Sequence, residues 1–182
     1  IVPARTLQIA QELYLAGIIS YPRTSSQKIP DAINPKAILK KLAKNFPKEI
    51  KLATRNSPIE GKKSDPAHPS ISPTGESPGS LEPELKKIYE LIARRFISCF
   101  CEDAIVENKT ITASTIPDKL LFKERGAEIL KKGWMEVYQA KMQEKELRDM
   151  NGKADITKVD IEKDETKPPR RFSPASILSE LE

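Results

Sequence analysis

The spacing of apolar residues changes near Asp103, and this change limits most strongly what the chain can fold into. Residues 81–100 place apolar side chains three and four positions apart, which predicts a long amphipathic helix. Beyond Asp103 the apolar residues are β-branched or aromatic and stand in short runs between turn residues, which is typical of strands. These runs lie at residues 106, 110–116, 120–122, 134–138 and 154–163. The sequence therefore predicts an α+β fold in which a helical unit precedes a β-rich unit.

Two shorter helices are predicted ahead of the long one. Residues 6–16 carry an apolar face, with Thr6 as the expected N-cap. Gly17 follows, where a left-handed residue would end that helix. Residues 35–45 form the second helix, and Pro35 at its start suits a first helical turn.

Residues 53–80 are rich in Pro, Ser, Gly and Lys and are predicted to form a long loop. Loops of this length inside a compact domain are usually functional or disordered. Prolines stand close to His68 and Thr74 and restrict the backbone, so both side chains are presented at a low entropic cost of ordering. A lone loop histidine is more often a bystander, so His68 is a candidate only in company with other residues.

The segment after Gly17 carries the candidate nucleophile. Pro22 favours extended backbone at Tyr21, and alternate residues of an extended chain share a face, so Ile19, Tyr21 and Arg23 are expected on one side. The guanidinium group favours the phenolate and can grip a phosphate, while Thr24 and Ser26 add neutral donors. A tyrosine that attacks a phosphodiester needs such neighbours. The commoner reading of an isolated Tyr-x-Arg is a half-buried tyrosine beside a solvated arginine.

Charge is distributed unevenly along the chain, which has a net charge of +5. Residues 36–63 carry nine Lys and Arg against two acids, whereas residues 136–165 carry nine acids against six bases. A local excess of positive charge suits the phosphate backbone of nucleic acid, although a solvated helix face explains the same run equally well. No apolar run approaches the ~18 residues of a membrane span, so no membrane partner is expected and the predicted compartment is the cytoplasm.

The cysteines and the histidine argue against a metal centre in these residues. Cys99 and Cys101 flank Phe100 in an apolar run and are predicted to lie in or beside the core. Their spacing fits neither a disulfide framework nor a metal motif. With His68 as the single histidine, a site with several histidine ligands is excluded.

Five stretches, in the right order, resemble type IA DNA topoisomerases. The first contains Ser-Tyr-Pro-Arg-Thr-Ser-Ser and resembles the active-site tyrosine segment, most closely in its archaeal form. The others resemble the histidine-containing loop, a Tyr-Glu-Leu-Ile-x-Arg-Arg-Phe helix, a Gly-Trp strand and a Pro-Pro-Arg entry to a helix. The five stretches are residues 12–26, 67–75, 88–96, 133–138 and 167–182.

The resemblance implies a role for each candidate residue. Tyr21 would be the nucleophile that forms a 5′-phosphotyrosyl bond, and Arg23 would steady the phenolate and the scissile phosphate. His68 would donate a hydrogen bond to the phosphate. Weaker candidates for contacts with the bound strand are Thr24, Ser26 and Thr74. Bacterial members often carry arginine where Ser72 stands, so Ser72 is given no catalytic role.

The resemblance also implies how the chain is divided. Residues 1–95 would form a helical, winged-helix-like (CAP-like) tyrosine domain, residues 96–166 part of a β-rich arch, and residues 167–182 the start of the next helical domain. The family's Mg²⁺ site lies in a Toprim domain, and no Asp-x-Asp-x-Glu occurs here. The expected partners are therefore a single-stranded segment of negatively supercoiled DNA and the Toprim and gate domains of the same protein, and the isolated chain is expected not to relax DNA.

Two alternatives remain from the sequence. A helix followed by glycine and an apolar strand start also describes a non-catalytic winged-helix module, in which the basic flank binds phosphates and Tyr21 is structural. A weaker alternative is a protein-interaction platform built on an exposed sheet edge.

Overall fold

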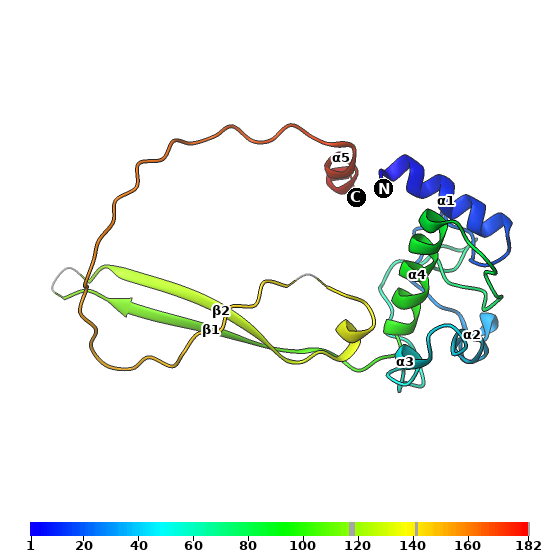
Figure 1. The fold of residues 1–182 in the computed structure, drawn as a ribbon, viewed down its shortest axis with the longest axis horizontal. Helices are drawn as coiled ribbons and strands as arrows, with labels where there is room; N and C mark the ends of the chain where they lie inside the picture. The colour runs from blue at the N-terminus through cyan, green and yellow to red at the C-terminus, as the bar shows by residue number, and fades with distance from the viewer. Residues whose placement is uncertain (117–118, 141, 182) are drawn as a thin grey trace.

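The computed structural model describes residues 1–116, 119–140 and 142–181. It is a mixed α+β structure, mostly helical, as the change of pattern near Asp103 predicted. A helical body holds the first hundred residues, and a long two-stranded hairpin projects from it (Figure 1). None of the described helices is long and apolar enough to cross a membrane.

Helix α1 spans Pro3–Leu15, so it begins three residues before the predicted start. The prediction of Thr6 as N-cap is wrong, because Pro3 fits the first turn and Val2 takes the cap position. The Thr6 hydroxyl instead donates back to the Val2 carbonyl over 3.1 Å. The end of the helix is as predicted: Gly17 has φ of +75° and its N–H donates to the Tyr14 carbonyl over 2.8 Å.

Helix α2 spans Pro35–Leu42 and ends earlier than the predicted Asn45. Its start is fixed by Asn34, which adopts φ of 50° and accepts a hydrogen bond from the Ala37 N–H over 3.2 Å. Two short elements flank it, the 3₁₀ helix η1 at Asp31–Ile33 and α3 at Pro47–Ile50.

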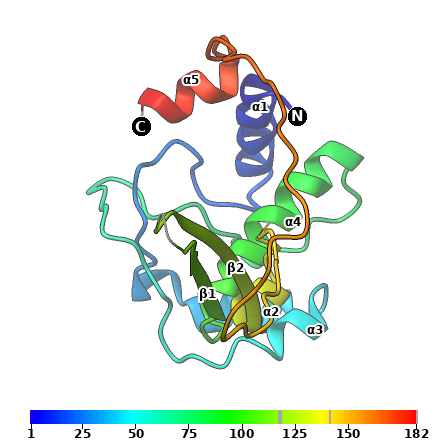
Figure 2. The same ribbon diagram turned by 90° about the vertical axis from the view of Figure 1, so that its left-hand side faces the viewer.

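Helix α4 spans Pro83–Ser98 and packs across α1, so the long helix of the sequence is confirmed (Figure 2). Its buried side chains form the centre of one core with side chains of α1, α2 and the segments after them. Cys101 is buried and Cys99 partly buried, as expected for an apolar run. The largest fully buried side chains of this core are Ile9, Leu13, Ile19, Leu42, Ile97, Phe100 and Val137.

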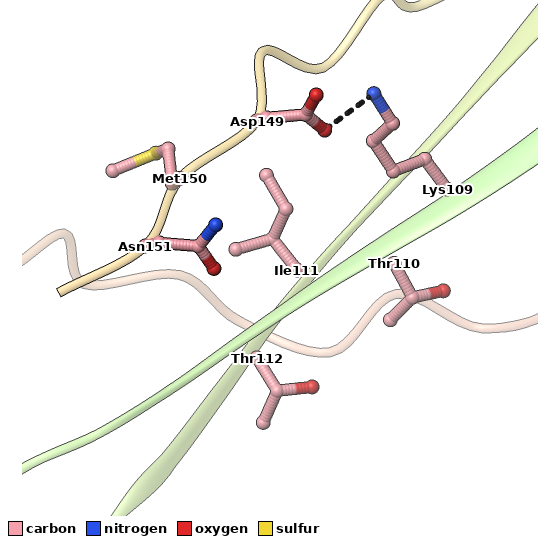
Figure 3. A pocket seen from close by; sticks show the side chains of 7 residues that line it. All are labelled: Lys109, Thr110, Ile111, Thr112, Asp149, Met150 and Asn151. Carbon is pink, nitrogen blue, oxygen red and sulfur yellow. Dashed lines mark ion pairs between the residues drawn. The ribbon is translucent and has the colours of Figure 1, made fainter.

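The β structure of the described residues is a hairpin. Strand β1, Ile105–Ser114, pairs antiparallel with β2, Leu121–Lys131. Residues 142–151 then cross the hairpin from β2 to β1. Lys145 exchanges two backbone hydrogen bonds with Ala127 of β2, and the ammonium group of Lys109 on β1 lies 2.9 Å from Asp149 (Figure 3).

Two predicted strands are wrong. Gly133–Glu136 is a 3₁₀ helix, η2, because Gly133 turns the chain at φ of +50° and Trp134 packs against the helical core. Residues 154–163 form no strand, since alternation of side chains alone does not make a strand without a neighbour to hydrogen-bond. Helix α5, Pro174–Leu181, begins as predicted, with the Ser173 hydroxyl accepting from the Ser176 N–H over 3.1 Å.

Candidate functional site

Two segments that are far apart in sequence lie against each other and carry the predicted site residues. Residues 18–28 follow α1, and residues 63–74 form the second half of the long loop. Ile19 and Pro73 make an isolated antiparallel bridge. Four backbone hydrogen bonds of 2.8–3.1 Å join the segments: Ser20 to Ser72, Thr74 to Ile18, Ser70 to Lys28 and Gln27 to Lys63.

Ser20 ties the two segments together with its side chain as well. Its hydroxyl donates to the Ser70 carbonyl over 3.1 Å and accepts from the Ser72 N–H over 2.8 Å. Ser72 itself is only 3% exposed, so its side chain faces the interior. The backbone around Ser72 thus has a structural role in joining the two segments.

The structure brings Tyr21 and His68 together. Their ring centroids are 4.5 Å apart with an interplanar angle of 42°. Tyr14, on the last turn of α1, packs edge-on against Tyr21 with centroids 5.3 Å apart. Tyr21 remains partly exposed rather than sealed in the core, so its phenol is open to a ligand from solvent. A partly exposed phenol thus lies beside an imidazole, and both belong to residues that the sequence analysis singled out.

A carboxylate fixes the backbone that carries His68. Asp65 Oδ1 accepts hydrogen bonds from the N–H groups of Ala67 over 2.8 Å and of His68 over 3.2 Å. The Ala67 N–H, more than any other neighbour, lowers the pKa of Asp65, since it stabilises the charged carboxylate. Asp65 therefore holds the turn in place through its ionised form.

Arg23 is exposed, and its side chain makes no hydrogen bond or ion pair with any residue that the structure describes. Pro22 between Tyr21 and Arg23 is buried. Ile19 is only 1% exposed and packs in the core, so the prediction that it shares the face of Arg23 is wrong. The guanidinium group is thus free to meet a ligand but is not held against the phenol.

The three hydroxyl candidates are engaged within the protein. Thr24 donates to the His68 carbonyl over 3.4 Å and accepts from the Ser26 N–H. Ser26 is 8% exposed and accepts from the Lys28 N–H over 3.2 Å. Thr74 donates to the Gly17 carbonyl over 2.8 Å. In this structure, the three hydroxyl groups therefore stabilise the segments that carry Tyr21 and His68.

Sequence reasoning missed Ser20 and Asp65, which position the two rings. An Asp followed by Pro favours a turn in which the Asp side chain accepts from backbone N–H groups ahead of it, and this signal marks Asp65. No local pattern marks Ser20, because both groups that its hydroxyl meets lie about fifty residues away.

The basic run of residues 36–63 lies on the surface of the same body. Lys40 and Lys41 of α2 and Lys44 just after it are exposed. Some of this charge is neutralised locally, since Lys41 pairs with Glu76 over 2.6 Å and Arg55 with Asp103 over 2.9 Å. Within residues 1–116, 119–140 and 142–181, no three potential metal ligands cluster, so the residues present do not fit a Mg²⁺ site.

Comparison with known proteins accounts for this arrangement. The model of the DNA topoisomerase family matches residues 1–182. DNA topoisomerase 1 of Methanothermobacter thermautotrophicus is 42% identical over 186 residues, which cover 99% of this chain and 26% of that protein. DNA topoisomerase 1 of Pyrococcus horikoshii is 42% identical over 192 residues, covering 99% of this chain and 28% of that protein. DNA topoisomerase 3 of Dictyostelium discoideum is 32% identical, with 98% of this chain and 22% of that protein covered.

A solved structure shows the same fold. Full-length topoisomerase I from Thermotoga maritima matches with a TM-score of 0.59 and 23% identity, over 84% of this chain and 26% of that one. The chain therefore belongs to the DNA topoisomerase family, in its type IA class. It spans about a quarter of the length of the curated relatives that it matches.

Proposed function

We propose that this chain is the tyrosine-bearing part of a topoisomerase that cleaves one DNA strand, allows another to pass and then reseals the break, so that supercoiled DNA is relaxed. The observation that carries the proposal is the partly exposed Tyr21 ring held 4.5 Å from the His68 ring by two segments joined in several places. Family membership supports it, because the chain matches the family model throughout.

The proposed step is a transesterification at Tyr21. The phenolate oxygen attacks the phosphorus of a DNA phosphodiester and forms a 5′-phosphotyrosyl bond. The bond from phosphorus to the 3′ oxygen breaks, and that oxygen leaves as a hydroxyl after taking up a proton. The reverse attack by the 3′ hydroxyl restores the strand and the phenol. One phosphoester replaces another, so no nucleotide is consumed.

Arg23 and His68 would act on the charge that develops at phosphorus. The exposed guanidinium group of Arg23 would close on the scissile phosphate, and an electrostatic contact of this kind contributes about 3 kcal/mol in comparable sites. The His68 imidazole would hydrogen-bond the same phosphate from the other segment. Thr24, Ser26 and Thr74 stay candidates for weaker contacts with the strand.

The proposal keeps the expected division into residues 1–95 as a winged-helix-like tyrosine domain, 96–166 as part of an arch and 167–182 as the start of another domain. The hairpin that projects from the helical body supports an arch-like role for the second part. Mg²⁺ would be held by a Toprim domain outside these residues, so we derive no step through the metal and expect the chain alone not to relax DNA. DNA is the proposed partner and the cytoplasm the proposed compartment.

A chimera tests the proposal. This chain would replace the matching quarter of the Methanothermobacter thermautotrophicus relative, and the chimera would be mixed with single-stranded DNA labelled at its 3′ end in a magnesium buffer. The expected result is label attached covalently to protein on a denaturing gel. Tyr21→Phe should abolish the adduct, whereas Tyr14→Phe, which alters the neighbouring phenol, should preserve it.

Two further variants sharpen the result. His68→Ala should slow adduct formation without preventing it, and Arg23→Ala should do so more strongly. An adduct that persists in Tyr21→Phe would remove Tyr21 as nucleophile. DNA binding without any adduct in the unaltered chimera would favour the non-catalytic winged-helix module.

A further inference from the structure

A cavity of about 270 Å³ lies between the end of α2, the loop after Thr74 and Tyr89 of α4. It is lined by neither Tyr21 nor His68. Its polar lining residues are Lys41, Lys44, Asn45, Glu76, Ser77 and Tyr89. Nothing in the proposed cleavage chemistry uses them.

Tyr89, which lines this cavity, carries an unpartnered and buried polar group. Its side chain is only 2% exposed, yet its hydroxyl has no hydrogen-bond partner among the residues that the structure describes. Burial raises the pKa of Tyr89, so the hydroxyl keeps its proton and remains a donor. A buried donor without an acceptor is rare in native proteins, and it points to an acceptor that is supplied from outside the chain.

The charges around the cavity favour an anion. Lys41 is paired with Glu76 over 2.6 Å, which leaves that pair neutral. Lys44 has no carboxylate partner within the described part of the chain. The Asn45 amide and the Ser77 hydroxyl add neutral donors, so the lining offers donors of three kinds around one uncompensated positive charge.

The loop wall of the cavity is held close to α2. Gly75 has φ of +84°, and a Cβ atom built there would lie 2.9 Å from Cδ of Lys41. Only glycine allows both this backbone conformation and this approach. Thr74, the preceding residue, is tied to Gly17, so the wall is anchored to the same frame that carries Tyr21.

We propose that this cavity binds a phosphate group of a DNA strand, at a place separate from the phosphate that Tyr21 attacks. The ligand chemistry is a phosphate oxyanion, which accepts from the Tyr89 hydroxyl and pairs with the Lys44 ammonium group. That the phosphate comes from DNA rests on the proposed function. A free phosphate ion carries the same oxyanion. The second experiment below therefore compares binding of inorganic phosphate with binding of DNA.

The first measurement is the affinity of the whole 182-residue chain for a fluorescein-labelled thymidine dodecanucleotide, by fluorescence anisotropy at low salt. Tyr89→Phe and Lys44→Gln should each raise Kd about 3- to 10-fold, the range expected for one hydrogen bond or one phosphate contact. Lys48→Gln is the matched control, because it removes the same charge from an exposed residue of α3 outside the cavity, and it should change Kd less than about 2-fold.

The second measurement identifies the source of the phosphate. In ¹H–¹⁵N spectra, the amide signals of Gly75 and Ser77 should shift saturably with the oligonucleotide, and in Tyr89→Phe they should reach saturation only at about 3- to 10-fold higher oligonucleotide concentration. Saturation by inorganic phosphate alone at the same signals would assign the site to the free ion and overturn the DNA source. If these signals saturate with the oligonucleotide and not with inorganic phosphate, the ligand of the cavity is a phosphodiester group of the DNA strand.

A folding control keeps the result interpretable. Tyr89→Phe removes an unpartnered hydroxyl, so it should unfold no earlier than the unaltered chain. Earlier unfolding with unchanged oligonucleotide affinity would assign the hydroxyl to a bound water and overturn the proposal, as would equal effects of Lys44→Gln and Lys48→Gln. None of these outcomes changes the result expected for the covalent adduct at Tyr21. Failure of the phosphate-site proposal and failure of the proposed function can therefore be distinguished.

Discussion

Replacing Ser20 by alanine should loosen the site without touching either ring. The Ser20 hydroxyl donates to the Ser70 carbonyl over 3.1 Å and accepts from the Ser72 N–H over 2.8 Å. It is thus the one side chain that joins the Tyr21 segment to the His68 loop through two hydrogen bonds among the described residues. Ser20→Ala removes both bonds and adds no bulk.

The size of the effect follows from these two bonds. A neutral hydrogen bond contributes about 0.5–1.5 kcal/mol net, and a partner left unpaired in the interior costs about 1–3 kcal/mol. Ser72 is 3% exposed, so water does not easily replace the lost acceptor for its N–H group. We expect the free energy of unfolding to fall by about 2 kcal/mol, or about 30-fold in the folding equilibrium.

Urea denaturation followed by the fluorescence of Trp134, which packs against the core, measures this change. Hydrogen exchange of the Ser72 amide gives a local readout and should become at least about 10-fold faster. Ser25→Ala is the control, because Ser25 is exposed on the same segment, and it should change stability by less than about 0.5 kcal/mol. If Ser20→Ala is as stable as this control, the two segments are held by their backbone alone and the reasoning fails.

Three further predictions follow from local geometry. Gly126→Ala should speed exchange of the Lys145 amide, because a Cβ atom at Gly126 would overlap the Lys145 carbonyl oxygen and force residues 142–151 off the hairpin; unchanged exchange would contradict this. Burial raises the pKa of Cys101 to about 11, so iodoacetamide at pH 8 should alkylate it at least about 100-fold more slowly than a free thiol, as mass spectrometry would show. The pKa of Asp65 lies below its ordinary 3.8, so its turn keeps its stabilisation at neutral pH and loses it only as pH falls through that lowered pKa. The amide shift of Ala67 should therefore titrate below pH 3.8, and not at all in Asp65→Asn.

The helices were predictable from sequence because their signals are local. The apolar stripe of α4, the glycine after α1 and the proline at the start of α2 each act within a turn or two. The strand prediction at residues 134–138 failed for a tertiary reason: Trp134 has a core to pack against, and Gly133 supplies the turn that brings it there. Residues 154–163 show the opposite case, in which a strand-like pattern has no neighbouring strand among the described residues.

For the site, sequence identified Tyr21 and His68 as candidates, but not their contact. That contact depends on hydrogen bonds between segments about fifty residues apart, which no local pattern encodes. The pairing of Tyr21 with Arg23 was argued from alternation along one extended segment, and alternation sets only the side on which each residue lies. The structure leaves the Arg23 side chain exposed and without a hydrogen-bond or ion-pair partner among the described residues, so its role stays a prediction.

Thr74 shows how a hydroxyl near a site is limited by its own hydrogen bonds. A threonine has one hydroxyl hydrogen to donate, and Thr74 gives it to the Gly17 carbonyl over 2.8 Å while its oxygen accepts from the Glu76 N–H over 3.2 Å. A phosphate that claimed this hydrogen would leave the carbonyl at the end of α1 unpaired, so the exchange gains little free energy. The same two bonds join the end of α1 to the wall of the Tyr89 cavity. The segment that carries Tyr21 and the loop that lines the Tyr89 cavity are therefore joined at Thr74. Thr74 stabilises both through its two hydrogen bonds.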